Sequence, residues 1–118
     1  MKKAFLFPGQ GSQFIGMGKE LASQFEVAKD VFSEVDEALG ERLSTLMFGG
    51  DIEELTLTKN AQPAIMAVSI AILRVMSSNG LNLKTIDLLA GHSLGEYSAL
   101  CASGVVSLRD TAIILRKR

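Results

Sequence analysis

The chain has 118 residues, of which 47% are hydrophobic and 21% are charged, a composition typical of one small globular domain covering residues 1–118. Its formal net charge is −1 and its sharpest basic cluster is only Arg116–Arg118, which argues against a nucleic-acid-binding protein. A single cysteine, Cys101, excludes an internal disulfide and a cysteine-rich metal site, so we predict no metal. Its apolar neighbours favour a buried side chain over a reactive thiol.

Two apolar segments are similar in composition to a targeting signal and to a membrane-spanning segment. The run after Met1 ends at Pro8, which is too short for a secretory signal, and no small-residue cleavage site follows. The run from Ala64 to Leu73 is closed by Arg74 and is shorter than the roughly 20 residues that a bilayer requires. We therefore expect no membrane association and a cytoplasmic location.

The first third of the chain predicts a strand, a loop and one or two helices. Residues 4–7 are apolar on both faces, as in a buried strand of a parallel sheet. A glycine-rich loop covers residues 9–18. Helical spacing over residues 19–39 then predicts one helix, or two with a break near Phe25, ending at Gly40.

The middle of the chain is helical and becomes strongly apolar. Residues 43–48 and 51–55 predict two short helices. Asn60 is the predicted N-cap of a helix from Gln62 to about Ser77, with Pro63 in its first turn. Because this helix has no polar face, we expect it to lie in the middle of the fold.

The last third predicts a strand over residues 86–90, a tight turn over 91–95 and a helix over 96–102. A final helix, capped by Ser107, follows to the last residue. The alternation of helices and strands indicates an α/β fold, but two strands are too few for a stable sheet. We therefore expect exposed apolar surface and an unpaired sheet edge.

The turn from Gly91 to Gly95 matches Gly-x-Ser-x-Gly and lies between a predicted strand and a predicted helix. Side chains at the two glycines would collide with neighbouring backbone, and their absence lets Ser93 stand clear of the sheet at a helix N-terminus. The backbone N–H of Leu94 is then the natural donor to a developing oxyanion. The pattern alone fits a glycine-rich turn with a capping serine equally well.

The only histidine, His92, precedes Ser93 directly. Neighbouring side chains at the end of a strand point to opposite sides, so the imidazole is badly placed to take the serine proton. We interpret His92 as a structural residue beneath the turn. If Ser93 is a nucleophile, its general base must come from elsewhere.

Two motifs carry a resemblance to a known family: "FLFPGQGSQ" at Phe5–Gln13 and "GHSLGEYSAL" at Gly91–Leu100, with "AQPA" at Ala61–Ala64 between them. Together they resemble the malonyl-CoA:acyl carrier protein transacylases of bacterial fatty acid synthesis, and nearly as well the acyltransferase domains of polyketide synthases. The resemblance implies the N-terminal part of an α/β-hydrolase-like acyltransferase domain, with a short parallel sheet and flanking helices. The family's remaining strands, its ferredoxin-like subdomain and its catalytic histidine lie further along the chain than these 118 residues reach.

The resemblance also implies the role of each site residue. Ser93 would be acylated by malonyl-CoA and would pass the malonyl group to the phosphopantetheine thiol of acyl carrier protein, with no other cofactor. The backbone N–H groups of Gln10 and Leu94 would form the oxyanion hole. Arg118 would bind the malonyl carboxylate, a pairing that suits a guanidinium. Gln62 matches a glutamine near the family's active site, and Leu94 after the serine matches its malonyl-selective members.

Three functions remain open from the sequence. The first is part of a transacylase. It is inactive alone and becomes active when a separate chain supplies the missing half. The second is a non-catalytic module that binds acyl-CoA or a carrier protein. The third is a serine hydrolase of the α/β type, against which the lack of an "HGGG"-like segment argues.

Overall fold

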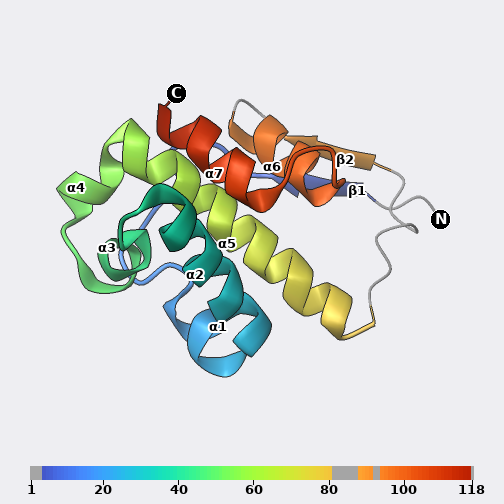
Figure 1. The fold of residues 1–118 in the computed structure, drawn as a ribbon, viewed down its shortest axis with the longest axis horizontal. Coiled ribbons are helices and arrows are strands. Elements are labelled where there is room, and N and C mark those ends of the chain that lie inside the picture. Colours follow the sequence, from blue (N-terminus) through green and yellow to red (C-terminus); the bar gives the residue numbers. More distant parts are fainter. Residues whose placement is uncertain (1–3, 81–87, 92–93, 118) are drawn as a thin grey trace.

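The computed structural model describes residues 4–80, 88–91 and 94–117. Within them, β1 (Ala4–Phe7) and β2 (Leu88–Gly91) form a two-stranded parallel sheet, and helices make up most of the other described residues (Figure 1). The register pairs Ala4 with Leu88 and Phe7 with Gly91. The predicted short parallel sheet is confirmed, although residues 86 and 87 of the predicted second strand lie outside the described residues.

The first helical segment is divided into α1 (Lys19–Gln24) and α2 (Glu26–Leu39). The break falls at Phe25, whose φ of −129° is extended, so the two-helix alternative is the one that forms. α2 ends at Gly40, where φ is 67° and the backbone N–H donates to two carbonyls of the last turn. This left-handed conformation is one that glycine adopts at little cost, which is why the helix ends there.

Two short helices follow, α3 (Leu43–Gly49) and α4 (Ile52–Thr56), as the sequence predicts. The Asp51 carboxylate caps α4 by accepting a hydrogen bond from a backbone N–H of its first turn. The Asp36 carboxylate on α2 accepts hydrogen bonds from both the backbone N–H and the hydroxyl of Ser44. This pair of bonds fixes α3 against α2.

The long apolar helix, α5, runs from Thr58 to Ser78, so the predicted N-cap at Asn60 is wrong. Pro63 lies inside the helix instead of in its first turn. The Asn60 side chain donates to the Glu54 backbone carbonyl at 2.8 Å and thereby joins α5 to α4. This tertiary hydrogen bond replaces the capping bond that the local sequence suggests.

α5 is the central helix of the fold, as its composition predicts. In Figure 1 it runs between α1–α4 on one side and the sheet with α6 (Leu94–Ala102) and α7 (Leu108–Lys117) on the other, and it packs against α2, α6 and α7. Its length and composition would also suit a membrane-spanning helix, but 56% of its most apolar window is buried inside the protein. Packing within the protein therefore accounts for its apolar character.

α6 begins at Leu94, two residues before the predicted start of that helix. It carries Cys101, which is half-buried and packs against the core, as expected for a structural cysteine. Burial raises the pKa of the Cys101 thiol, although a hydrogen bond with Thr111 of α7 acts in the opposite direction. A raised pKa leaves less of the reactive thiolate at neutral pH.

α7 is capped by Ser107, whose hydroxyl oxygen accepts a hydrogen bond from the Asp110 backbone N–H at 3.1 Å. We expect Ser107→Ala to lower the free energy of unfolding by about 1 kcal/mol, the usual cost of losing such a cap. Urea denaturation followed by circular dichroism would measure the change. Ser103→Ala is the matched control, because this exposed hydroxyl donates to a carbonyl three residues earlier and caps no helix start. Equal losses from both variants would contradict the capping role.

Candidate active site

The turn between β2 and α6 is too tight for any residue but glycine at two positions. A Cβ atom added to Gly91 would lie 2.1 Å from the backbone carbonyl carbon and oxygen of Gly95. A Cβ atom added to Gly95 would lie 2.3 Å from the backbone oxygen of Phe7, the last residue of β1. The steric reason predicted for these glycines is therefore confirmed, and the first turn of α6 rests directly on the end of β1.

Ser93, His92 and Arg118 lie outside the described residues, so their predicted roles stay predictions. The residues on either side of the first two are described. Gly91 ends β2, and Leu94, which is completely buried, begins α6. The Leu94 backbone N–H belongs to the first turn of α6, where a helix leaves its N–H groups without internal partners.

The loop that contains Gln10 starts at the same end of the sheet as the turn from Gly91 to Gly95, which we call the serine turn. Phe7 pairs with Gly91 across the two parallel strands, so both chain segments leave the sheet side by side. The carboxyl ends of parallel strands are where α/β proteins usually bind their ligands. The structure thus brings together the two motifs that the sequence singles out.

Hydrogen bonds inside the loop fix its shape. The Ser12 hydroxyl donates to the Gly9 carbonyl at 3.0 Å, and the Gly11 backbone N–H donates to the Gln13 side-chain oxygen at 2.8 Å. Gly11 has a φ of 107°, a conformation that favours glycine. In contrast to Gly11, Gln10 has a backbone N–H that makes no hydrogen bond to another described residue. An N–H of this kind is free to bind a ligand oxygen.

The Gln10 side chain is held between two residues of α5. Its Nε2 donates to the Thr58 hydroxyl oxygen at 3.1 Å, and its Oε1 accepts from Gln62 Nε2 at 3.4 Å. Gln62 is 6% exposed, and its Oε1 is buried without a hydrogen-bond partner among the described residues. The structure therefore joins two of the predicted site residues, Gln10 and Gln62.

Sequence reasoning missed Thr58. The available signal is its spacing from Gln62, because residues four positions apart lie on the same face of a helix. The predicted helix start hid this signal, since it placed Thr58 before the helix.

Comparison with known proteins decides the family. Residues 4–118 match the model of the acyl transferase domain. The chain belongs to the acyl transferase domain family. Among its relatives, the malonyl CoA-acyl carrier protein transacylase of Bacillus subtilis strain 168 is 59% identical over 117 residues. That alignment covers 99% of the chain and 36% of the relative. The mycoketide-CoA synthase of Mycobacterium tuberculosis is 40% identical, and the match covers 99% of this chain but 3% of the synthase.

Solved structures agree with this assignment. The acyl-carrier-protein S-malonyltransferase of Bartonella henselae superposes with a TM-score of 0.96 at 62% identity, over 98% of this chain and 37% of that chain. A malonyl-transacylase in complex with a type II polyketide acyl carrier protein superposes with a TM-score of 0.93 at 42% identity, over 99% of this chain and 37% of that one. The predicted resemblance to malonyl-CoA:acyl carrier protein transacylases is confirmed. The chain spans 36% of the length of the Bacillus subtilis transacylase and 37% of the length of each of these two solved chains.

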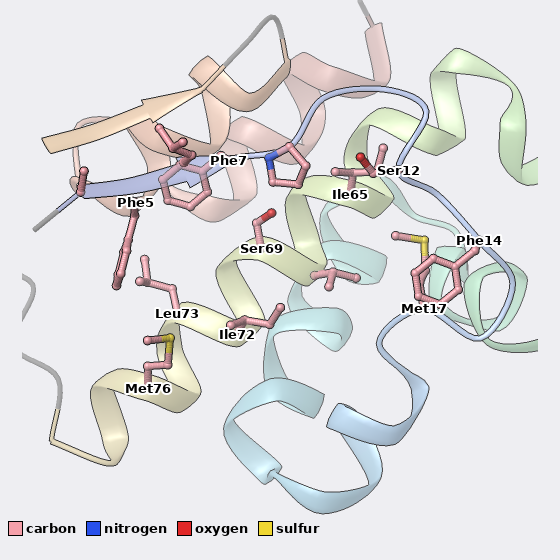
Figure 2. Close-up of a pocket in the computed structure, with 14 residues that line it drawn as sticks. Phe5, Phe7, Ser12, Phe14, Met17, Ile65, Ser69, Ile72, Leu73 and Met76 are labelled. Carbon is pink, nitrogen blue, oxygen red and sulfur yellow. The ribbon is translucent and has the colours of Figure 1, made fainter.

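A second feature of the structure is an apolar cavity of about 420 Å³ between β1, the following loop and α5. Figure 2 shows Phe5 and Phe7 of β1 on one side of it and Leu73 and Met76 of α5 on the other. No charged side chain lines it, so its described wall offers no cation to pair with a carboxylate. Several of its lining side chains are exposed, which confirms the predicted exposure of apolar surface: Leu6 at 78%, Phe14 at 60%, Ile72 at 45% and Met76 at 40%.

Proposed function

We propose that this chain carries the nucleophile and the oxyanion hole of a malonyl-CoA:acyl carrier protein transacylase of fatty acid synthesis. The supporting observation is that the serine turn packs tightly on the end of β1. The loop that contains Gln10 begins at that same strand end. The higher identity to the Bacillus subtilis transacylase, 59% against 40% for the mycoketide-CoA synthase, favours fatty acid synthesis over polyketide synthesis.

In the proposed reaction the Ser93 hydroxyl oxygen attacks the thioester carbonyl carbon of malonyl-CoA, and a general base takes its proton. The negative charge on the carbonyl oxygen is stabilised by the backbone N–H groups of Gln10 and Leu94, each such donor being worth about 3 kcal/mol. Collapse of this tetrahedral intermediate breaks the carbon–sulfur bond and releases coenzyme A as a thiol, with the proton returned by the base. The phosphopantetheine thiol of acyl carrier protein then attacks the malonyl-serine ester in the same way and regenerates Ser93.

Arg118 is proposed to select malonyl over uncharged acyl groups, because a guanidinium binds a carboxylate through two parallel hydrogen bonds. Gln62 is proposed to act at the same site. The partner is acyl carrier protein, and one of the similar solved structures is a complex of a malonyl-transacylase with such a protein. The reaction would take place in the cytoplasm with no cofactor beyond the phosphopantetheine of the partner.

The general base is proposed to lie outside the 118 residues, because the only histidine is His92, directly beside Ser93. The remaining strands of an α/β-hydrolase-like sheet and a ferredoxin-like subdomain are proposed to accompany that base. The proposal accords with the 36% of the Bacillus subtilis transacylase that the chain covers.

A hybrid enzyme tests the proposal: the chain replaces the 117 residues that it aligns with in the Bacillus subtilis transacylase. We expect the hybrid to transfer malonyl groups from malonyl-CoA to acyl carrier protein at a rate within about tenfold of the parent transacylase. Mass spectrometry of the protein incubated with malonyl-CoA alone should find malonyl on Ser93, and Ser93→Ala should carry none. Ser98→Ala, which removes a buried hydroxyl from α6, is the control and should still be labelled. Labelling that persists in Ser93→Ala would refute the assignment.

A further inference from the structure

We propose that Thr58 is a positioning residue of the oxyanion hole: its hydroxyl holds the Gln10 side chain so that the Gln10 backbone N–H stays directed at the thioester oxygen. The inference rests on the proposed transacylase function. Thr58 is assigned no contact with the substrate itself.

The loop around Gln10 needs such an anchor. Gly9 and Gly11 flank Gln10, and glycine allows the backbone more conformations than any other residue. The bonds from Ser12 to Gly9 and from Gly11 to Gln13 lie within the loop, so they fix its shape but not its place on the protein.

The Gln10 side chain connects the loop to α5, while the far end of the loop is held by the Gly16 backbone N–H, which donates to the Met47 carbonyl of α3 at 2.7 Å. Of the hydrogen bonds that residues 8–14 make among the described residues, those to Thr58 and Gln62 are the two that reach another element. Both partners lie on one face of α5, at its first residue and one turn later. The shorter of the two bonds, 3.1 Å against 3.4 Å, is the one to Thr58.

An unanchored Gln10 would move. Its side chain is exposed, and a free glutamine side chain gains up to about 2 kcal/mol of rotamer entropy over a fixed one. Once the side chain is released from α5, φ and ψ of Gln10 can vary between the two flanking glycines, so its N–H would point at the reacting oxygen for less of the time. A preorganised donor stabilises an oxyanion because its orientation costs nothing at the moment of reaction.

The variant that tests this is Thr58→Val, which keeps the branched shape and removes the hydroxyl. In the hybrid enzyme we expect kcat to fall about tenfold, less than the loss from deleting a donor outright, with KM for malonyl-CoA changed less than about threefold. Thr58→Ser, which keeps the hydroxyl, should restore kcat to within about twofold of the parent hybrid.

Thr56→Val is the matched control, because the Thr56 hydroxyl donates to the Ile52 carbonyl within α4 and does not contact Gln10. Its kcat should equal that of the parent hybrid. If Thr58→Val and Thr56→Val have the same kcat in an active hybrid, the positioning role is wrong while the transacylase function stands.

A second measurement does not depend on activity. In the isolated chain, ¹⁵N relaxation should show that Thr58→Val increases the nanosecond motion of the Gln10 backbone N–H and that Thr56→Val does not. An inactive parent hybrid would refute the proposed function, and the anchoring of Gln10 by Thr58 would then be judged by this relaxation experiment. Unchanged relaxation in Thr58→Val refutes the anchor.

Discussion

With its general base outside the 118 residues, as proposed, the isolated chain should transfer malonyl groups to acyl carrier protein at least about a thousandfold more slowly than the hybrid enzyme, because a serine without a base loses several orders of magnitude in rate. Donors to the oxyanion do not compensate for this loss, since the serine hydroxyl remains protonated at neutral pH. Transfer of radiolabelled malonyl from malonyl-CoA, with equal amounts of the two proteins, measures the ratio.

His92→Ala in the isolated chain provides the control. Its rate should equal that of the unchanged chain if His92 is structural. A rate close to that of the hybrid enzyme, lost in His92→Ala, would show that this histidine is the base and would overturn its structural interpretation. Adding the remainder of the Bacillus subtilis transacylase as a separate polypeptide should restore activity if the two parts assemble.

Gly95→Ala should prevent stable folding or cost more than about 4 kcal/mol, a loss beyond that of most single substitutions. The new methyl carbon would lie 2.3 Å from the Phe7 backbone oxygen, and neither β1 nor α6 can withdraw without breaking the contact between them. Gly91→Ala should behave alike, with its methyl carbon 2.1 Å from the Gly95 backbone. Thermal or urea unfolding of each variant is the measurement.

Gly49→Ala is the control for this pair. Gly49 is the last residue of α3, and a Cβ atom there would have no neighbour within 4 Å. Alanine favours a helix over glycine by up to about 1 kcal/mol, so this variant should be as stable as the parent or slightly more stable. If Gly95→Ala unfolds at the same urea concentration as Gly49→Ala, the serine turn is looser than the structure describes.

Local signals in the sequence predicted most of the fold correctly. Gly40 ended α2 because a left-handed residue was required there, and Phe25 divided the first helical segment. The start of α5 was mispredicted because the Asn60 amide bonds to Glu54 of a neighbouring helix, and spacing along the chain carries no information about that contact. Capping rules describe a helix in isolation, and here packing between helices decided where α5 begins.

The candidate site was predicted to a similar extent. The glycines around Ser93 followed from sterics that the pattern itself encodes, and Gln10 and Gln62 were found through the family motifs. The anchoring of Gln10 by Thr58 could not be found in this way, because it depends on how α5 lies beside the loop. Ser93 and Arg118 were predicted from sequence alone and lie outside the described residues.

The pairing of β1 with β2 has a consequence for how the protein forms in the cell. Phe7 meets Gly91, more than eighty positions further along the chain. During translation β1 leaves the ribosome long before its partner exists, while α1, α2 and α5 can already associate. Contacts between residues so distant in sequence form slowly, because a long loop must close first. We therefore expect α1 to α5 to fold early, the sheet to form as a late step, and the newly made β1 to need shielding by a chaperone in the interval.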